Sequence, residues 1–390
     1  MRYSIASASL LLLLHSLFGA HLLADTAKTS AKQQASWEVL LGQQLFFDTN
    51  LSHNRTQSCA SCHAPDQGFV DVRGKGVLAA VSLGDDGKSL GDRSAPTASY
   101  AAYTPVFHQN KKGNFAGGQF WDGRANTLAD QAAGPPLNPI EMGMPDKASI
   151  VERLQENPQY VMQFKKLIGD AVFKDNDVAY AAMANAIARF EETDFFSPFD
   201  SKYDRYLKGE YQLTSQEELG KTLFFSQQFT NCNLCHQLRT TPERREETFT
   251  NYEFHNIGVP ANLALRALNG VTGVDNGLFN HPNITDTAMQ GKFKTPTLRN
   301  VAVTGPYMHN GVFKDLRTVV LFYNKYNSRS EKRQINPETG KRWRVPEVPE
   351  NLSQEELETG PALTDKRIDA LVAFLQTLTD KKYEHLISSD

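Results

Sequence analysis

The stretch QSCASCHAPD (residues 57–66) decides the fold, together with a second stretch, NCNLCHQL (residues 231–238). These two stretches contain all four cysteines of the 390-residue chain, each time as Cys-x-x-Cys followed directly by His. This pattern is the attachment signal for c-type haem, in which two thiols add to the haem vinyl groups and the histidine ligates the iron. We therefore expect two covalent haems, one on Cys59, Cys62 and His63 and one on Cys232, Cys235 and His236.

Other uses of Cys-x-x-Cys fit this sequence less well. A disulfide framework belongs to small, cysteine-dense secreted domains, and four cysteines in 390 residues are too few for that. A zinc site would draw two Cys-x-x-Cys halves together but does not require a histidine after each half. A redox dithiol requires neither that histidine nor a second copy of the motif. Haem attachment accounts for all of these features at once.

The sequence around the two motifs is also repeated. LGQQLFFD (residues 41–48) precedes the first motif, and LGKTLFFS (residues 219–226) precedes the second. Downstream of the motifs, SAPTASY (residues 94–100) is echoed by KTPTLRN (residues 294–300). We interpret these pairs as a duplication that places one haem in each half of the chain.

The spacing of apolar residues predicts a mostly α-helical protein. Residues 177–192 and 365–380 place apolar side chains at helical spacing, whereas strand-like alternation is scarce. A Thr-Ser-x-x-Glu helix start appears at residues 214–218, just after the boundary that we expect between the two halves. The sequence thus predicts two cytochrome c-like domains, residues 36–205 and residues 206–390, each with one covalently attached haem.

The N-terminus has the pattern of a secretory signal. Arg2 precedes an apolar run over residues 5–18, and small residues follow that run. The run is too short to span a bilayer comfortably, so we expect a cleaved signal peptide at residues 1–24, a polar leader at residues 25–35, and a periplasmic protein without stable membrane insertion. The net charge of -3 gives no reason to expect nucleic acid as a partner.

The segment GGQFWDGRANTLADQAAGPPLNPIEMG (residues 117–143) lies between the two haem motifs. With these motifs the chain resembles the bacterial di-haem cytochrome c peroxidase and MauG superfamily over residues 38–380. The resemblance implies that Trp121 lies between the haems and that Gln131 and Glu141 line the distal pocket of the peroxide-reactive haem. A carboxylate held above an open iron can relay a proton between the two peroxide oxygens. A buried core Trp and a solvated Glu are the structural alternatives.

The resemblance also bears on the first haem's sixth ligand. In many members a histidine caps this iron until reduction displaces it, and that position falls on Asp86 here. No histidine occurs between His63 and His108, although His53 and His108 lie elsewhere in the chain. We therefore expect a first haem that is permanently five-coordinate, as in the MauG branch.

For the second haem, two residues are candidates for the axial ligand on the side of the ring opposite His236. GPYMHNG (residues 305–311) offers the thioether of Met308, whereas the spacing of the MauG branch, fourteen residues after His309, points to Tyr323. We favour Tyr323, with Met308 as the runner-up; the alternative is that Tyr323 is only an aromatic on a helix face. The resemblance also implies a calcium ion held by Thr304, Pro306 and Ser94, where Ser94 replaces the family's Asn.

The sequence as a whole predicts an exported di-haem peroxidase. Hydrogen peroxide would be reduced at the N-terminal haem, oxidising equivalents would be shared with a His/Tyr-ligated C-terminal haem, and electrons would come from a small c-type cytochrome or cupredoxin. One alternative is a MauG-like enzyme that oxidises a side chain of a partner protein. A second alternative is an electron carrier without enzymatic activity, which would need both irons saturated by protein ligands.

Overall fold

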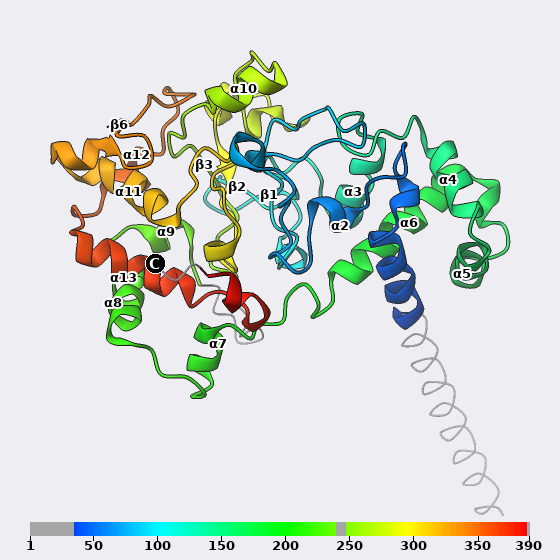
Figure 1. Cartoon of the computed structure of the whole chain (residues 1–390), viewed down its shortest axis with the longest axis horizontal. Coiled ribbons are helices and arrows are strands. Elements are labelled where there is room, and N and C mark those ends of the chain that lie inside the picture. Colours follow the sequence, from blue (N-terminus) through cyan, green and yellow to red (C-terminus); the bar gives the residue numbers. More distant parts are fainter. Residues whose placement is uncertain (1–34, 239–246, 388–390) are drawn as a thin grey trace, which may run out of the picture.

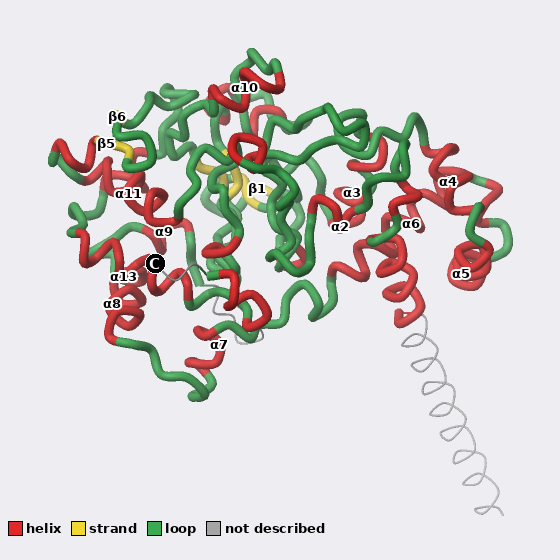
Figure 2. Tube along the Cα trace, in the orientation of Figure 1, coloured by secondary structure: helices red, strands yellow, loops and turns green. Residues whose placement is uncertain are grey.

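The computed structural model describes residues 35–238 and 247–387, and within these ranges helices and long loops dominate (Figures 1 and 2). This agrees with the mostly α-helical prediction. The strands of the described residues form three antiparallel pairs of two residues each: β1 His108–Gln109 with β2 Phe115–Ala116, β3 Phe254–His255 with β4 Phe293–Lys294, and β5 Ile335–Asn336 with β6 Lys341–Arg342.

The longer helices pack in two hydrophobic cores, and shorter helices lie in the segments between them. An N-terminal helix, described over residues 35–46, is followed by α2 Cys59–Cys62, α3 Leu128–Ala132, α4 Lys147–Gln155, α5 Pro158–Ile168, α6 Asn176–Glu191, α7 Lys202–Leu207, α8 Ser215–Phe225, α9 Cys232–Cys235, α10 Leu263–Asn269, α11 Leu316–Asn327, α12 Gln354–Glu358 and α13 Asp365–Gln376. Single turns of 3₁₀ helix, among them η3 Ala101–Tyr103 and η8 Val301–Val303, connect them.

The first core gathers around α6. The Asp175 side chain caps this helix by accepting hydrogen bonds from the N–H groups of Asp177 and Val178. Met183 and Ile187, one turn apart, are both buried, and α6 packs against α3 and α4. Burying an apolar side chain of this size contributes about 1.5–3 kcal/mol, so the predicted amphipathic pattern accounts for the position of the helix.

The second core gathers around α8, α11 and α13, on the left of Figure 1. Thr214 caps α8 in a capping box: the Thr214 N–H donates to Glu217 Oε2 (2.7 Å), and the Glu217 N–H donates to Thr214 Oγ1 (3.3 Å). The predicted helix start at residues 214–218 is confirmed. Helix α8 packs against α13, which covers most of the segment predicted to be helical at residues 365–380.

The repeated LG-x-x-LFF sequence makes the same helix contact in both halves. A Cβ atom on Gly42 would lie 1.8 Å from the carbonyl oxygen of Ala186 in α6, and a Cβ atom on Gly220 would lie 1.9 Å from that of Ala370 in α13. Only glycine lets each helix pair approach so closely. The sequence repeat is therefore also a structural repeat.

The second repeated motif joins the two halves. Tyr100 and Asn300 occupy equivalent places in SAPTASY and KTPTLRN, and both have a left-handed backbone, with φ of 61° and 62°. Their side chains meet at one carboxylate: Tyr100 Oη donates to Asp380 Oδ1 (2.5 Å), and Asn300 Nδ2 donates to Asp380 Oδ2 (2.8 Å). Asp380 is buried, and this burial raises its pKa to about 6.

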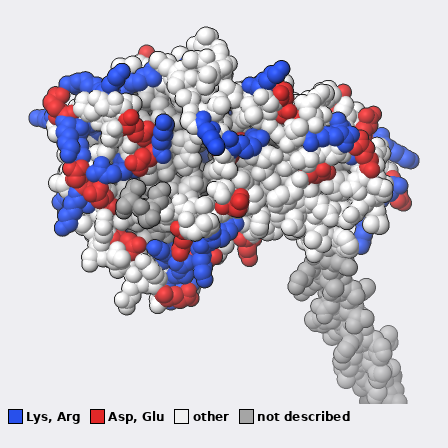
Figure 3. Space-filling model, in the orientation of Figure 1, with Lys and Arg blue, Asp and Glu red and all other residues white. Residues whose placement is uncertain are grey.

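The predicted signal peptide, residues 1–24, lies outside the described residues, as does nearly all of the leader at residues 25–35. Within the described ranges no helix is long and apolar enough to cross a membrane. On the face shown in Figure 3, Lys and Arg are interspersed with Asp and Glu, so this face presents a mixed rather than a single-sign surface.

The close helix contact at Gly220 can be tested by adding one methyl group. We expect Gly220→Ala to lower the free energy of unfolding by about 1–3 kcal/mol, because the new Cβ forces α8 away from α13. Urea denaturation followed by circular dichroism measures this loss. Gly273→Ala is the matched control, because a Cβ there would meet no atom within 4 Å. Equal stability of the two variants would contradict the packing described here.

Candidate functional site

The first haem motif forms a single helical turn, α2, capped by Ser58 and Ser61. His63 follows this turn, is partly buried, and lies with Nδ1 3.3 Å from the carbonyl oxygen of Phe69. A carbonyl can only accept a hydrogen bond, so Nδ1 carries the proton and Nε2 is left free to ligate a metal. Burial lowers the pKa of His63, which favours the neutral imidazole that ligation requires.

The second motif repeats this arrangement. His236 follows the turn α9, and its Nδ1 lies 2.9 Å from the carbonyl oxygen of Phe249. Burial lowers the pKa of His236 to about 4. Phe69 and Phe249 both have a left-handed backbone, with φ of 58° and 54°, so the same local conformation aims a carbonyl at each histidine.

The two cysteine pairs do not converge on one site. All four thiols are free, and Cys59 packs against the first core whereas Cys232 packs against the second. Each pair therefore has a histidine and a core of its own. This arrangement has the donor set that two separate c-type haems require, and it does not bring the pairs together as one zinc site would.

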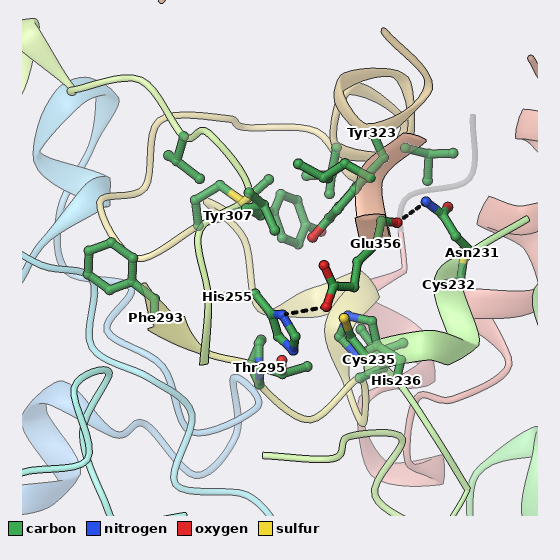
Figure 4. Close-up of a pocket in the computed structure, with 18 of the residues that line it drawn as sticks. Asn231, Cys232, Cys235, His236, His255, Phe293, Thr295, Tyr307, Tyr323 and Glu356 are labelled. Carbon is green, nitrogen blue, oxygen red and sulfur yellow. Dashed lines mark hydrogen bonds and ion pairs between the residues drawn. The ribbon is translucent and has the colours of Figure 1, made fainter. Parts of the chain in front are cut away.

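A large, mostly apolar cavity lies beside the second motif (Figure 4). Cys232, Cys235 and His236 line one part of it, and Tyr323 extends into it from α11 on the side away from His236. An apolar cavity with two thiols and an imidazole at its wall fits a covalently attached haem with an axial histidine.

Both candidates for the second haem's far ligand line this cavity. Tyr323 lines the cavity together with Cys232 and Cys235, and burial raises the pKa of its phenol well above the usual value. Met308 lines the same cavity with a left-handed backbone, at φ of 73°. Geometry therefore brings both residues to the site without choosing between them.

Glu141 lies near the first motif. It is partly buried, and Asn138 Nδ2 donates to its Oε1 (2.9 Å). Burial raises the pKa of Glu141, although the charge of Arg124 partly opposes this. The Asp85 N–H donates to the Glu141 carbonyl (2.7 Å), and the Asp85 carboxylate accepts from Thr56 Oγ1 (2.5 Å), so Glu141 is linked to the residue directly before the first motif. Gln131 lies in α3 of the same half and is partly buried.

Trp121 connects the two halves. Its indole Nε1 donates to the carbonyl oxygen of Ser94 (2.8 Å), and its own carbonyl oxygen accepts from the Lys294 N–H (2.9 Å). The side chain also lines the cavity beside the second motif, called the second cavity below, so this residue of the N-terminal half reaches the C-terminal site.

The residues considered as caps for the first iron lie at the surface. Asp86 is exposed, and its carboxylate accepts hydrogen bonds from Lys88 and Ser89 on its own turn. His108 is exposed, and its Nδ1 lies 2.8 Å from the carbonyl oxygen of Val106. His53 is exposed as well.

The three residues expected at the calcium site are already engaged in local contacts. Ser94 donates its N–H to the His309 carbonyl (2.7 Å) and accepts from Trp121 as described above. Thr304 Oγ1 donates to the Val301 carbonyl (3.5 Å), and Pro306 follows a cis peptide bond. In the described ranges no group of three or more His, Cys, Asp and Glu side chains is arranged to hold a metal ion.

The sequence did not indicate several polar residues of the second cavity. Glu356 lies near its centre in Figure 4, with its Oε1 3.7 Å from His255 Nδ1, and its carbonyl accepts from Asn231 Nδ2. These residues are distant in sequence, so nothing local could have grouped them. Lys294 also lines the cavity, and its place inside the repeated KTPTLRN motif was an available signal.

Comparisons with known proteins agree with this geometry. A family model described as di-haem cytochrome c peroxidase matches residues 36–212. The methylamine utilization protein MauG of Paracoccus denitrificans is 55% identical over 350 residues, 89% of each chain. The cytochrome c peroxidase Ccp of Escherichia coli is 34% identical over 290 residues, 74% of this chain and 53% of that one.

Solved structures give the same result. The structure of the diheme peroxidase BthA from Burkholderia thailandensis matches with a TM-score of 0.79 and 33% identity, over 90% of this chain and 88% of that one. A MauG-like protein associated with microbial copper homeostasis matches with a TM-score of 0.65 and 30% identity, over 90% of this chain and 91% of that one.

Haem stoichiometry tests the two motifs directly. We expect the purified protein to carry two covalent haems and no titratable thiol, because each motif has its own histidine and its own core. Intact mass and the pyridine haemochrome assay measure this number. The double variant Cys232→Ser, Cys235→Ser should retain one haem. A single haem on the unmodified protein, or a reactive thiol in it, would contradict the assignment.

Proposed function

This chain belongs to the di-haem cytochrome c peroxidase family, and from that premise we propose that it is an exported peroxidase that reduces hydrogen peroxide at its N-terminal haem. Its relatives are enzymes that act on peroxide or modify a protein, so the electron-carrier alternative is not retained. We further propose that the C-terminal haem shares the oxidising equivalents and that a small c-type cytochrome or cupredoxin supplies electrons.

The observation that carries the proposal is the contrast between Glu141 and the possible caps of the first iron. Glu141 is partly buried and is linked through Asp85 to the start of the first motif, whereas Asp86, His53 and His108 are exposed. A partly buried acid–base group near an iron without a sixth protein ligand is the arrangement that peroxide chemistry requires.

Haem bound at the first motif would supply the iron at which peroxide binds and accepts electrons. Glu141 would take the proton from one peroxide oxygen and return it to the other, so that water can leave without a net proton transfer to the protein. Burial raises the pKa of Glu141 toward the working pH, which suits a group that must both accept and donate. Asn138 would orient its carboxylate, and Gln131 would contribute a polar amide to the same pocket.

For the second haem we propose His236 and Tyr323 as axial ligands. Tyr323 reaches the cavity from α11, and an anionic phenolate stabilises oxidised iron, whereas the thioether of Met308 would stabilise reduced iron. Axial ligands and their surroundings shift haem potentials over about 0.8 V, so this choice decides whether the second haem stores an electron or shares oxidising equivalents. Trp121 would couple the two haems.

Three further features belong to the same proposal. The N-terminal domain would span residues 36–205 and the C-terminal domain residues 206–390. A calcium ion would lie between the haems at Ser94, Thr304 and Pro306. Residues 1–24 would direct export to the periplasm, where c-type haem proteins of this kind meet their donors.

A second candidate function is oxidation of a side chain in a partner protein. The observation that favours it is the 55% identity to a MauG over 89% of both chains. The reductant distinguishes the two functions: a peroxidase turns over with a small redox protein, whereas a protein-modifying enzyme leaves its partner covalently altered.

We expect Glu141→Gln to slow the peroxide-induced change in the haem spectrum by about 10²- to 10⁴-fold, because the amide cannot relay a proton. Stopped-flow mixing of resting ferric protein with hydrogen peroxide measures this rate. Glu152→Gln, an equivalent change at an exposed position of α4, is the control and should react as the unmodified protein does.

Two measurements on the resting ferric protein test whether the first iron has an open coordination position. The resting ferric protein should react with peroxide without prior reduction and should show one high-spin and one low-spin haem by electron paramagnetic resonance. Two low-spin haems with activity only after one-electron reduction would contradict an open iron. A loss smaller than about fivefold in Glu141→Gln would remove Glu141 from the proton relay.

We expect Tyr323→Met to preserve a low-spin second haem and to raise its reduction potential, because a neutral thioether replaces an anionic phenolate. Met308→Leu should leave the spectrum of this haem nearly unchanged. Potentiometric titration and electron paramagnetic resonance measure both effects. The reverse pattern, with a high-spin second haem in Met308→Leu and silent Tyr323 variants, would show that Met308 is the ligand.

A further inference from the structure

Lys294 is the only lysine or arginine among the described residues that line the second cavity. It lies in β4 next to β3, and its Nζ donates to the carbonyl oxygen of Gly118. An ammonium group has three donors, and this carbonyl is the one hydrogen-bond partner that the described residues provide for it. Lys294 therefore has donors to spare beside the cavity.

The charge of Lys294 lacks an ion-pair partner within the described ranges. Burial lowers its pKa to about 7, although the charge of Asp122 partly opposes this. Asp122 forms salt bridges with Arg93 (2.7 Å) and Arg124 (2.9 Å), so it is already committed. A partly buried cation without a partner is unfavourable, and a carboxylate placed in the cavity would keep it charged.

The carboxylates that line the cavity are engaged elsewhere. Asp275 pairs with Arg93 (2.7 Å), Glu347 pairs with Arg266, and Glu356 lies 3.7 Å from His255. The protein's own acidic groups at this wall thus have other partners. A counter-charge for Lys294 would therefore come from a group bound in the cavity.

Haem chemistry supplies such an anion at the required place. The vinyl groups, which cysteines attach, and the two propionates occupy opposite edges of the macrocycle. Figure 4 labels both neighbours of Lys294: Phe293 lies on the side of the view away from Cys232 and Cys235, and Thr295 lies at the lower centre near His255, so the segment that carries Lys294 runs from the far side of the view toward the centre. We propose that Lys294 binds a propionate of the C-terminal haem and so fixes the edge of the ring that lies away from the thioether bonds.

This contact would make Lys294 a positioning residue for electron transfer between the haems. The N–H of Lys294 donates to the carbonyl of Trp121 (2.9 Å), so a haem edge held by Lys294 is also held at a set place relative to Trp121. The inference rests on the proposed attachment of a haem to Cys232 and Cys235.

The test uses the holoprotein and the variant Lys294→Met, which keeps the length and removes the charge. The reduction potential of the second haem should fall, because a cation beside the ring favours the added electron. The propionate bending bands in the resonance Raman spectrum should shift as well. Lys294→Arg keeps the charge and should restore the potential at least in part.

Lys292→Met is the matched control. It removes the same charge two residues away, but Lys292 does not line the cavity, so its effect on the potential should be clearly smaller. The haem count of the unmodified protein separates the two levels of the argument. Fewer than two haems would overturn the proposed function itself. If both haems are present but Lys294→Met leaves the potential of the second haem and its propionate bands as they are in the unmodified protein, only the propionate contact is overturned.

Discussion

Two backbone carbonyl groups, those of Phe69 and Phe249, are the constraint on which the rest of the site depends. Each accepts the Nδ1 proton of the histidine in a haem motif, and each is aimed by a left-handed backbone that an aromatic residue rarely adopts. The Phe69 ring is fully buried, and so is the Phe249 ring. The cores thus stabilise the strained conformation that orients the ligands, and loss of such an outer contact commonly costs 10- to 100-fold in metal affinity or activity.

The Pro-Thr loops extend this constraint to the junction of the halves. Thr97 Oγ1 donates to the carbonyl of Gly68 (2.6 Å), and Thr297 Oγ1 donates to that of Thr248 (2.7 Å), so each loop holds the segment that orients a histidine. Three residues after these threonines, Tyr100 and Asn300 donate hydrogen bonds to the same carboxylate, that of Asp380. The orientation of each histidine is therefore linked through a short chain of contacts to the interface.

Local signals explain what the sequence could predict. The capping box at Thr214 and the helical spacing of residues 177–192 and 365–380 depend on residues a few positions apart, and these predictions match the described structure. The close contact of Gly220 with Ala370 could not be read in this way, because it joins helices 150 positions apart. The same holds for the ion pair between Arg93 and Asp275, which links the two halves (2.7 Å). Tertiary pairing decides such contacts, and a single sequence does not record it.

The two Pro-Thr repeats differ in the residue with which each begins. Ser94 and Lys294 occupy the same place in the two Pro-Thr repeats, and both bind Trp121, one through the indole N–H and one through the main-chain carbonyl. The residue between the two sites is thus held by equivalent positions of both halves. Those positions differ in chemistry: the serine side has no titratable group, whereas the lysine side places an amine at the wall of the cavity beside the second motif. With a haem attached at each motif as proposed, this difference would give the two haems different electrostatic surroundings, as a division into a reactive haem and a redox partner requires.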